Sequence, residues 1–156
     1  MTAQAQLAND LLADIRTPML RRLHAYWEER RRGRTMPARR DLDPTEFKFA
    51  LGHVLLIDVH YDPLRFRFRL HGAELAMRAG YDMTGKTVED LPHPENRAVF
   101  VNRCHDLVRS CEPFALRSER VLDGRNMRYE VVWLPLSEDG ERVTMLLGGL
   151  VYLDPP

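Results

Sequence analysis

The spacing of apolar residues predicts that the first third of the chain is helical. Two apolar stripes recur at intervals of three or four residues, consisting of Leu7, Leu11 and Ile15 and then of Leu20, Leu23 and Trp27. Thr17-Pro18 separates them and is typical of an N-cap followed by proline at the first helical position. Gly33 is expected to end the second helix, and Asp43-Pro44 to begin a short third one.

After Gly52 the hydrophobic period changes from 3.6 to 2, which predicts strands. Residues 54–59 form one strand and residues 64–70, which alternate without exception, form the next. A longer helix is expected from Pro94 to about Cys111, with Val101, Cys104 and Val108 on one face. Three strands should follow, at residues 112–122, 125–137 and 142–152.

Asp123-Gly124 and Asp139-Gly140 lie between the last three strands, and Asp-Gly is a strong hairpin signal. Two-residue loops fix the predicted register of each hairpin. The predicted pairs are Arg117 with Glu130 and Glu119 with Arg128 on the solvent side, Leu134 with Met145, and, for the first two strands, Val59 with Leu64 and Ile57 with Phe66.

The last two strands are apolar on both faces, so both faces of the sheet need a cover. The helices that lie between the second and third predicted strands can cover one face of the sheet. The N-terminal helices, or a second subunit, must cover the other. We therefore divide the chain into an N-terminal helical extension, residues 1–50, and a core domain, residues 51–156.

Several short sequence words recur in the order found in one bacterial protein family. They are Tyr26-Trp27 with Arg30, Pro37-Ala38-Arg39-Arg40-Asp41-Leu42-Asp43-Pro44, Phe66-Arg67-Phe68-Arg69-Leu70-His71-Gly72, Gly80-Tyr81-Asp82-Met83-Thr84-Gly85-Lys86 and Tyr129-Glu130-Val131-Val132-Trp133-Leu134-Pro135-Leu136-Ser137. Together they resemble a family of stand-alone PAS-like domains, long listed as a domain of unknown function, over roughly residues 20–150. Ala73 departs from the family, which more often has Thr there.

The resemblance implies an α+β fold with a five-stranded antiparallel sheet, helices inserted after the second strand and an N-terminal helical cap. It implies a sensory or protein-interaction module without implying a particular ligand. In this fold the expected pocket wall is an aromatic face made of Phe66, Phe68, Phe114, Tyr129 and Trp133. The same side chains could instead simply fill the core.

The sequence provides little support for a cofactor or a catalytic site. His105 lies where a haem-binding PAS domain has its axial ligand, but a single His carries little specificity. The Asn-Cys-Arg word of a flavin photosensor is missing, because the order here is Asn102-Arg103-Cys104. No metal-ligand pair, nucleophile elbow or phosphate loop is present. We expect no cofactor, no metal and no enzymatic activity, with the two cysteines reduced.

Charge is balanced overall but not locally. There are 23 basic and 23 acidic residues, yet residues 16–40 contain nine arginines against two glutamates, a net charge of +7. This segment is the one candidate for nucleic-acid binding. A zero net charge and the lack of aromatic residues within the arginine run favour a solvated helix end instead.

The sequence thus predicts a non-enzymatic, cytoplasmic PAS-type regulator that signals in trans. It would sense a small apolar or weakly polar ligand or dock a partner protein. A homodimer is expected, with Leu20, Leu23 and Trp27 buried against the sheet and the partner chain. The alternatives are a nucleic-acid-associated regulator that uses residues 16–40, or a small haem or flavin sensor. No apolar run is long enough to span a membrane.

Overall fold

The computed structural model describes residues 2–155, apart from the side chains of residues 4, 8 and 9. Its helices are α1 (Ala3–Leu11), α2 (Pro18–Arg31), α3 (Ala73–Ala79) and α4 (Pro94–Ser110). Its strands are β1 (Val54–His60), β2 (Arg65–His71), β3 (Phe114–Leu122), β4 (Arg125–Leu136) and β5 (Met145–Tyr152). Three 3-10 segments lie at Arg39–Asp41, Pro44–His53 and Val88–Asp90.

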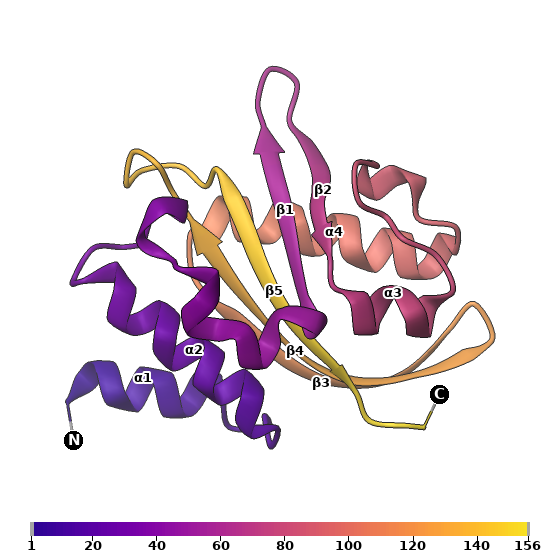
Figure 1. Ribbon diagram of the computed structural model, residues 1–156, viewed down its shortest axis with the longest axis horizontal. Helices are drawn as coiled ribbons and strands as arrows, with labels where there is room; N and C mark the ends of the chain where they lie inside the picture. The colour runs from indigo at the N-terminus through magenta and orange to yellow at the C-terminus, as the bar shows by residue number, and fades with distance from the viewer. Residues whose placement is uncertain (1, 156) are drawn as a thin grey trace.

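The strands form one antiparallel sheet in the order β2-β1-β5-β4-β3. Helices α1 and α2 lie on one side of the sheet, and α3 and α4 lie on the other (Figure 1). The order of elements and the five-stranded sheet confirm the α+β fold predicted from the sequence. Both faces of β4 and β5 are buried, as their two-sided apolar pattern requires.

The register of the β3–β4 hairpin is as predicted, with Arg117 opposite Glu130 and Glu119 opposite Arg128. The two other predicted registers are wrong by two residues. Leu134 pairs with Leu147 because Asp139 organises a longer loop, in which its carboxylate accepts the N–H groups of Glu141 and Arg142. A shift of two residues keeps every side chain on its face, so the division into two apolar faces is unaffected.

The β1–β2 register also differs from the prediction because of where the turn begins. Strand β1 continues to His60 before the turn, so Val59 pairs with Phe66, and Ile57 with Phe68. The register then shifts between Leu56 and Ile57, an irregularity that the alternating pattern of β2 does not reveal.

Helix α2 packs directly on the sheet through its apolar stripe. Leu20 and Leu23 are fully buried, and Trp27 is 2% exposed and donates from its indole nitrogen to the Pro135 carbonyl at 2.9 Å. The two leucines lie over Gly149, where an added Cβ would come within 2.9 Å of a methyl group of each. Glycine at this position is what allows α2 to approach β5 so closely.

The N-terminus of α2 is held by a side chain from the sheet. Thr17 occupies the predicted N-cap position but makes no side-chain cap. Instead one carboxylate oxygen of Glu130 accepts the N–H groups of Arg16 and Thr17, at 2.8 and 2.9 Å. The other oxygen accepts from Arg117 at 2.5 Å. An anion at this end of a helix is favoured by the helix dipole.

This arrangement corrects the prediction that Glu130 lies on the solvent side. The ion pair with Arg117 is present, but the segment that joins α1 and α2 covers Glu130, which is completely buried. Burial alone would raise the pKa of Glu130, but the N–H groups of Thr17 and Arg16 and the Arg117 guanidinium outweigh it and lower the pKa. The second predicted pair is exposed, as expected, with 3.7 Å between Arg128 and Glu119.

We predict that Glu130→Gln lowers the free energy of unfolding near neutral pH by about 3 kcal/mol, because it breaks a buried ion pair. The lowered pKa means that the carboxylate stabilises the fold above the ordinary glutamate value of 4.5. That stabilisation is lost as the pH falls through the lower folded pKa. Urea unfolding of both proteins should therefore show a difference that shrinks below about pH 4.5.

Glu119→Gln is the matched control, because it removes a carboxylate from the neighbouring exposed pair on the same hairpin. It should cost at most about 1 kcal/mol. An equal effect of the two variants would contradict the structural role assigned to Glu130.

Candidate functional site

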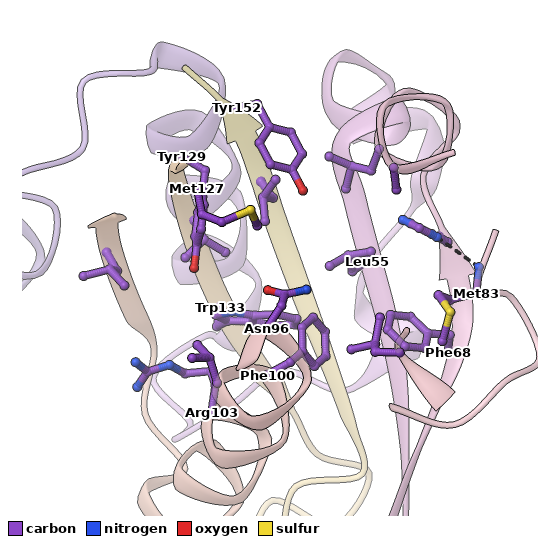
Figure 2. A pocket seen from close by; sticks show the side chains of 18 of the residues that line it. Leu55, Phe68, Met83, Asn96, Phe100, Arg103, Met127, Tyr129, Trp133 and Tyr152 are labelled. Atoms are coloured by element: carbon purple, nitrogen blue, oxygen red, sulfur yellow. Dashed lines mark hydrogen bonds between the residues drawn. The ribbon is translucent and has the colours of Figure 1, made fainter. Parts of the chain in front are cut away.

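A cavity of about 90 Å³ lies between the sheet and helices α3 and α4. Figure 2 shows the side chains that surround it. Its lining is mostly apolar and contains six aromatic residues, among them Tyr81 and Tyr152. The other four come from three different elements. They are Phe68 of β2, Phe100 of α4, and Tyr129 and Trp133 of β4. A concave, mostly apolar space with a few polar groups is the usual form of a small-molecule site.

The aromatic rings pack against one another in a defined way. The Phe100 ring meets the Trp133 indole edge to face, with centroids 5.4 Å apart, and is 5.4 Å from the Phe68 ring. The indole of Trp133 lies flat against β5 at Gly148, where an added Cβ would come within 2.6 Å of the ring. Gly148 therefore fixes the depth of the cavity floor, because no other residue leaves space for the indole.

Helix α4 presents Asn96, Val99, Phe100 and Arg103 to the cavity. These positions follow the spacing of a single helical face. The sequence pattern predicted that Val101, Cys104 and Val108 share one face of this helix, and only Cys104 of these three is fully buried. The cavity-facing residues of α4 were therefore missed.

His71 at the end of β2 also lines the cavity and was not predicted as a site residue. Its Nδ1 accepts the N–H group of Met83 at 3.0 Å, so the ring proton of the neutral form is on Nε2. Burial lowers the pKa of His71, although Asp82, 4.0 Å away, raises it. The side chain is thus a neutral hydrogen-bond donor at neutral pH.

Arg103 is the charged residue among the cavity lining. Its guanidinium carbon lies 3.4 Å from the centroid of the Phe114 ring, and Figure 2 shows the group turned away from Asn96 and Phe100. Burial lowers the pKa of Arg103, and the nearby Asp106 raises it. The cation is therefore stabilised by an aromatic face and a carboxylate outside the cavity.

Among the polar groups of the lining that make no hydrogen bond within residues 2–155 are one carboxamide and two hydroxyl groups. They are the Asn96 carboxamide and the hydroxyl groups of Tyr129 and Tyr152. In Figure 2 the carboxamide and the Tyr152 hydroxyl point into the space between the lining side chains. Because these atoms have no partner within the described chain, they can hydrogen-bond to solvent or to a bound ligand.

The structure brings together three of the five aromatic residues proposed from the sequence as a pocket wall. Phe68, Tyr129 and Trp133 line the cavity. Phe66 is fully buried elsewhere and meets the ring of His105 at 5.2 Å, while Phe114 stacks on Arg103 outside the cavity. The residues proposed for the helical cap, Leu20, Leu23 and Trp27, lie on the opposite side of the sheet.

The cysteines and histidines do not gather into a metal site within the described residues. Cys104 is fully buried, and burial raises the pKa of its thiol far above the usual range, which makes it unreactive. His105 packs against Phe66 rather than lining the cavity. Within the part of the chain that is described, no helix is long and apolar enough to cross a membrane.

The arginine-rich segment is largely engaged in contacts within the chain. Arg21 donates to the carbonyl groups of Leu12 and Ile15. Six more of its nine arginines bind a carboxylate, a carbonyl or an aromatic ring, in the pairs Arg22–Phe49, Arg30–Glu46, Arg31–Glu28, Arg34–Asp41, Arg39–Leu42 and Arg40–Glu138. Most of the local positive charge therefore stabilises the N-terminal region itself.

A second groove lies on the side of the sheet that α1 and α2 cover, where these helices meet the residues before β3. It measures about 390 Å³, and its walls include Leu7, His24, Trp27 and Cys111. The ion pair of Glu28 with Arg31 lies on its wall. Burial lowers the pKa of His24, although Glu28 raises it. This groove has no aromatic enclosure comparable to the inner cavity.

A family model described as PAS domain matches residues 15–151. The chain belongs to the PAS domain family. Among solved structures, it is similar to a light-oxygen-voltage domain that was studied with a flavin analogue. The match has a TM-score of 0.50 and 17% sequence identity, and it covers 70% of this chain and 83% of that chain. This likeness concerns the fold of the PAS domain alone.

Two further PAS-type structures match more distantly. One is a fungal LOV domain photoreceptor, with a TM-score of 0.44 and 17% identity over 65% of this chain and 75% of that chain. The other is a sensory box histidine kinase/response regulator from Burkholderia thailandensis E264, with a TM-score of 0.41 and 12% identity over 71% of this chain and 85% of that chain. No curated protein matches the chain.

We predict that Gly148→Ala displaces the Trp133 indole and lowers the free energy of unfolding by about 1–3 kcal/mol, because the new Cβ would overlap the ring. Fluorotryptophan NMR is the suitable measurement, since the chain contains two tryptophans, Trp27 on α2 and Trp133 beside the cavity on the other side of the sheet. The Trp133 resonance should shift strongly.

Gly149→Ala is the matched control, because the neighbouring residue faces α2 instead of the cavity. It should disturb the packing of Leu20 and Leu23 and leave the Trp133 resonance nearly unchanged. The assignment of the two glycines to opposite faces would be wrong if both variants moved the same resonance.

Proposed function

We propose that this PAS domain is a non-enzymatic, cytoplasmic sensory module that binds a small molecule in the cavity between the sheet and α4. The observation that carries the proposal is the cavity itself, which is lined by aromatic rings and by three polar groups that make no hydrogen bond within the described chain. These groups can therefore hydrogen-bond to a bound molecule. The family supports a sensory role.

The signal would pass to other proteins in trans, through the surface of this domain. The N-terminal helices are suited to this, because α2 packs on the opposite face of the same strands that form the cavity floor. A partner protein or a second copy of this chain would contact their outer side. Leu20, Leu23 and Trp27 are already buried within one chain, so they hold the cap in place instead of contacting a partner.

Native mass spectrometry of the purified protein tests ligand binding. We expect the wild-type protein to carry a small molecule that Trp133→Ala no longer retains, because the indole forms the cavity floor. That variant also costs about 3–5 kcal/mol of stability, so circular dichroism must show that it is folded. Trp133→Phe is a milder second variant. The proposal fails if the folded wild-type protein is empty and also binds nothing in a fragment screen by NMR.

We further propose a homodimer that forms through the outer side of the N-terminal helices. Leu7 of α1 is 69% exposed, and light scattering after size exclusion should show a dimer that Leu7→Lys weakens. Met77→Lys is the matched control, because Met77 is 76% exposed on α3, across the sheet. A wild-type monomer at every concentration would contradict the dimer without affecting ligand binding.

A further inference from the structure

The polar groups of the cavity indicate what kind of molecule it accepts. The Asn96 carboxamide offers a donor and an acceptor, and the hydroxyl groups of Tyr129 and Tyr152 offer the same. Within the described chain these groups have no hydrogen-bond partners. Tyr129 is 8% exposed, and Ser118, directly opposite it on β3, has a buried hydroxyl that also lacks a partner. A ligand here should therefore carry at least one hydrogen-bonding group.

The lining provides no charge directed at a ligand. It includes no aspartate or glutamate, and His71 is held as a neutral ring by the Met83 N–H group. The Arg103 guanidinium is placed over the Phe114 ring and turned away from the cavity centre. An ionised ligand would lose its hydration in this space without a counter-ion facing it, so the cavity favours an uncharged molecule.

The size and walls of the cavity favour a single flat ring. The cavity volume of about 90 Å³ is smaller than the roughly 150 Å³ that admits benzene in an engineered protein cavity. Phe100 is the wall ring that can make up the difference, because it comes from α4 and is only partly buried. If its side chain turns aside, an aromatic ligand can take its place between Phe68 and Trp133, with the same edge-to-face contact to the Trp133 indole.

We propose that the ligand of this cavity is an uncharged compound with one aromatic ring and one hydrogen-bonding group, of the phenol class. This inference rests on the proposed function, because it specifies the ligand of the same site. The ring lies between Phe68 and Trp133, and its polar group faces Asn96.

Four probes separate the features of this proposal in NMR titrations of the full chain. Phenol has the ring and the hydroxyl, toluene lacks the hydroxyl, cyclohexanol lacks the aromatic ring, and benzoate carries a charge. Phenol should bind roughly three- to ten-fold more tightly than toluene, which corresponds to one hydrogen bond. It should also bind more tightly than cyclohexanol, which lacks the aromatic contacts, and than benzoate, whose charge has no counter-ion facing it. Shifts should be largest at the fluorotryptophan signal of Trp133.

Asn96→Leu tests the polar contact while nearly preserving the volume of the side chain. It should reduce phenol affinity to that of toluene and leave toluene binding unchanged or improved. Asn102→Leu is the matched control, since Asn102 is exposed on the same helix, and it should not alter any of the four affinities. An unchanged preference for phenol in Asn96→Leu would overturn the assigned contact.

The other outcomes distinguish this proposal from the proposed function. Tighter binding of benzoate would show that Arg103 turns inward to recognise an anion, and equal binding of cyclohexanol would show that the ring is not recognised. Either result overturns the ligand class and retains a ligand-binding cavity. If no probe binds, a molecule retained in native mass spectrometry would overturn only the ligand class. An empty protein would overturn both proposals.

Discussion

The position of the N-terminal helices depends on one buried carboxylate. Glu130 belongs to β4, yet it binds two N–H groups that precede α2, more than a hundred residues earlier in the chain. Its second oxygen is neutralised by Arg117 on the adjacent strand. A buried charge is tolerated only when it is paired and hydrogen-bonded in this way. The contact therefore fixes where α2 begins, and the apolar stripe of α2 then follows along β5.

The β3–β4 hairpin, which carries Glu130, also holds the start of α4 on the other side of the sheet. At its turn, the Asp123 carboxylate accepts the N–H groups of Glu95 and Asn96, each at 3.0 Å, and the Glu95 carboxylate accepts the Asp123 N–H group in return. Burial would raise the pKa of Asp123, but these two N–H groups outweigh it and lower the pKa. Asn96 is thus positioned at the cavity by its own backbone. Strands β3 and β4 provide the anionic cap for both α2 and α4.

The local features of the fold could be predicted from the sequence, whereas the contacts between distant segments could not. The stripe of Leu20, Leu23 and Trp27 and the Arg117–Glu130 pairing follow from periodicity and from one Asp-Gly turn. Glu130 as a helix cap could not be foreseen, because no local pattern connects it with Thr17. The aromatic residues of β2 and β4 were recognisable, but Asn96 was not. A polar residue on the inner face of a helix is informative only once the cavity it faces is known.

At Gly148 and Gly149 of β5, side chains from both sides of the sheet pack directly against the backbone of one strand. These consecutive residues face opposite sides, so one leaves space for the Trp133 indole and the other for the leucines of α2. Protein interiors are packed at close to crystalline density, so a side chain added at either glycine would displace the neighbour on its own face. A larger residue at position 148 would keep the Trp133 indole farther from the backbone of β5, and one at position 149 would do the same to α2. The double glycine thus accounts both for the space of the cavity and for the close seating of the N-terminal cap.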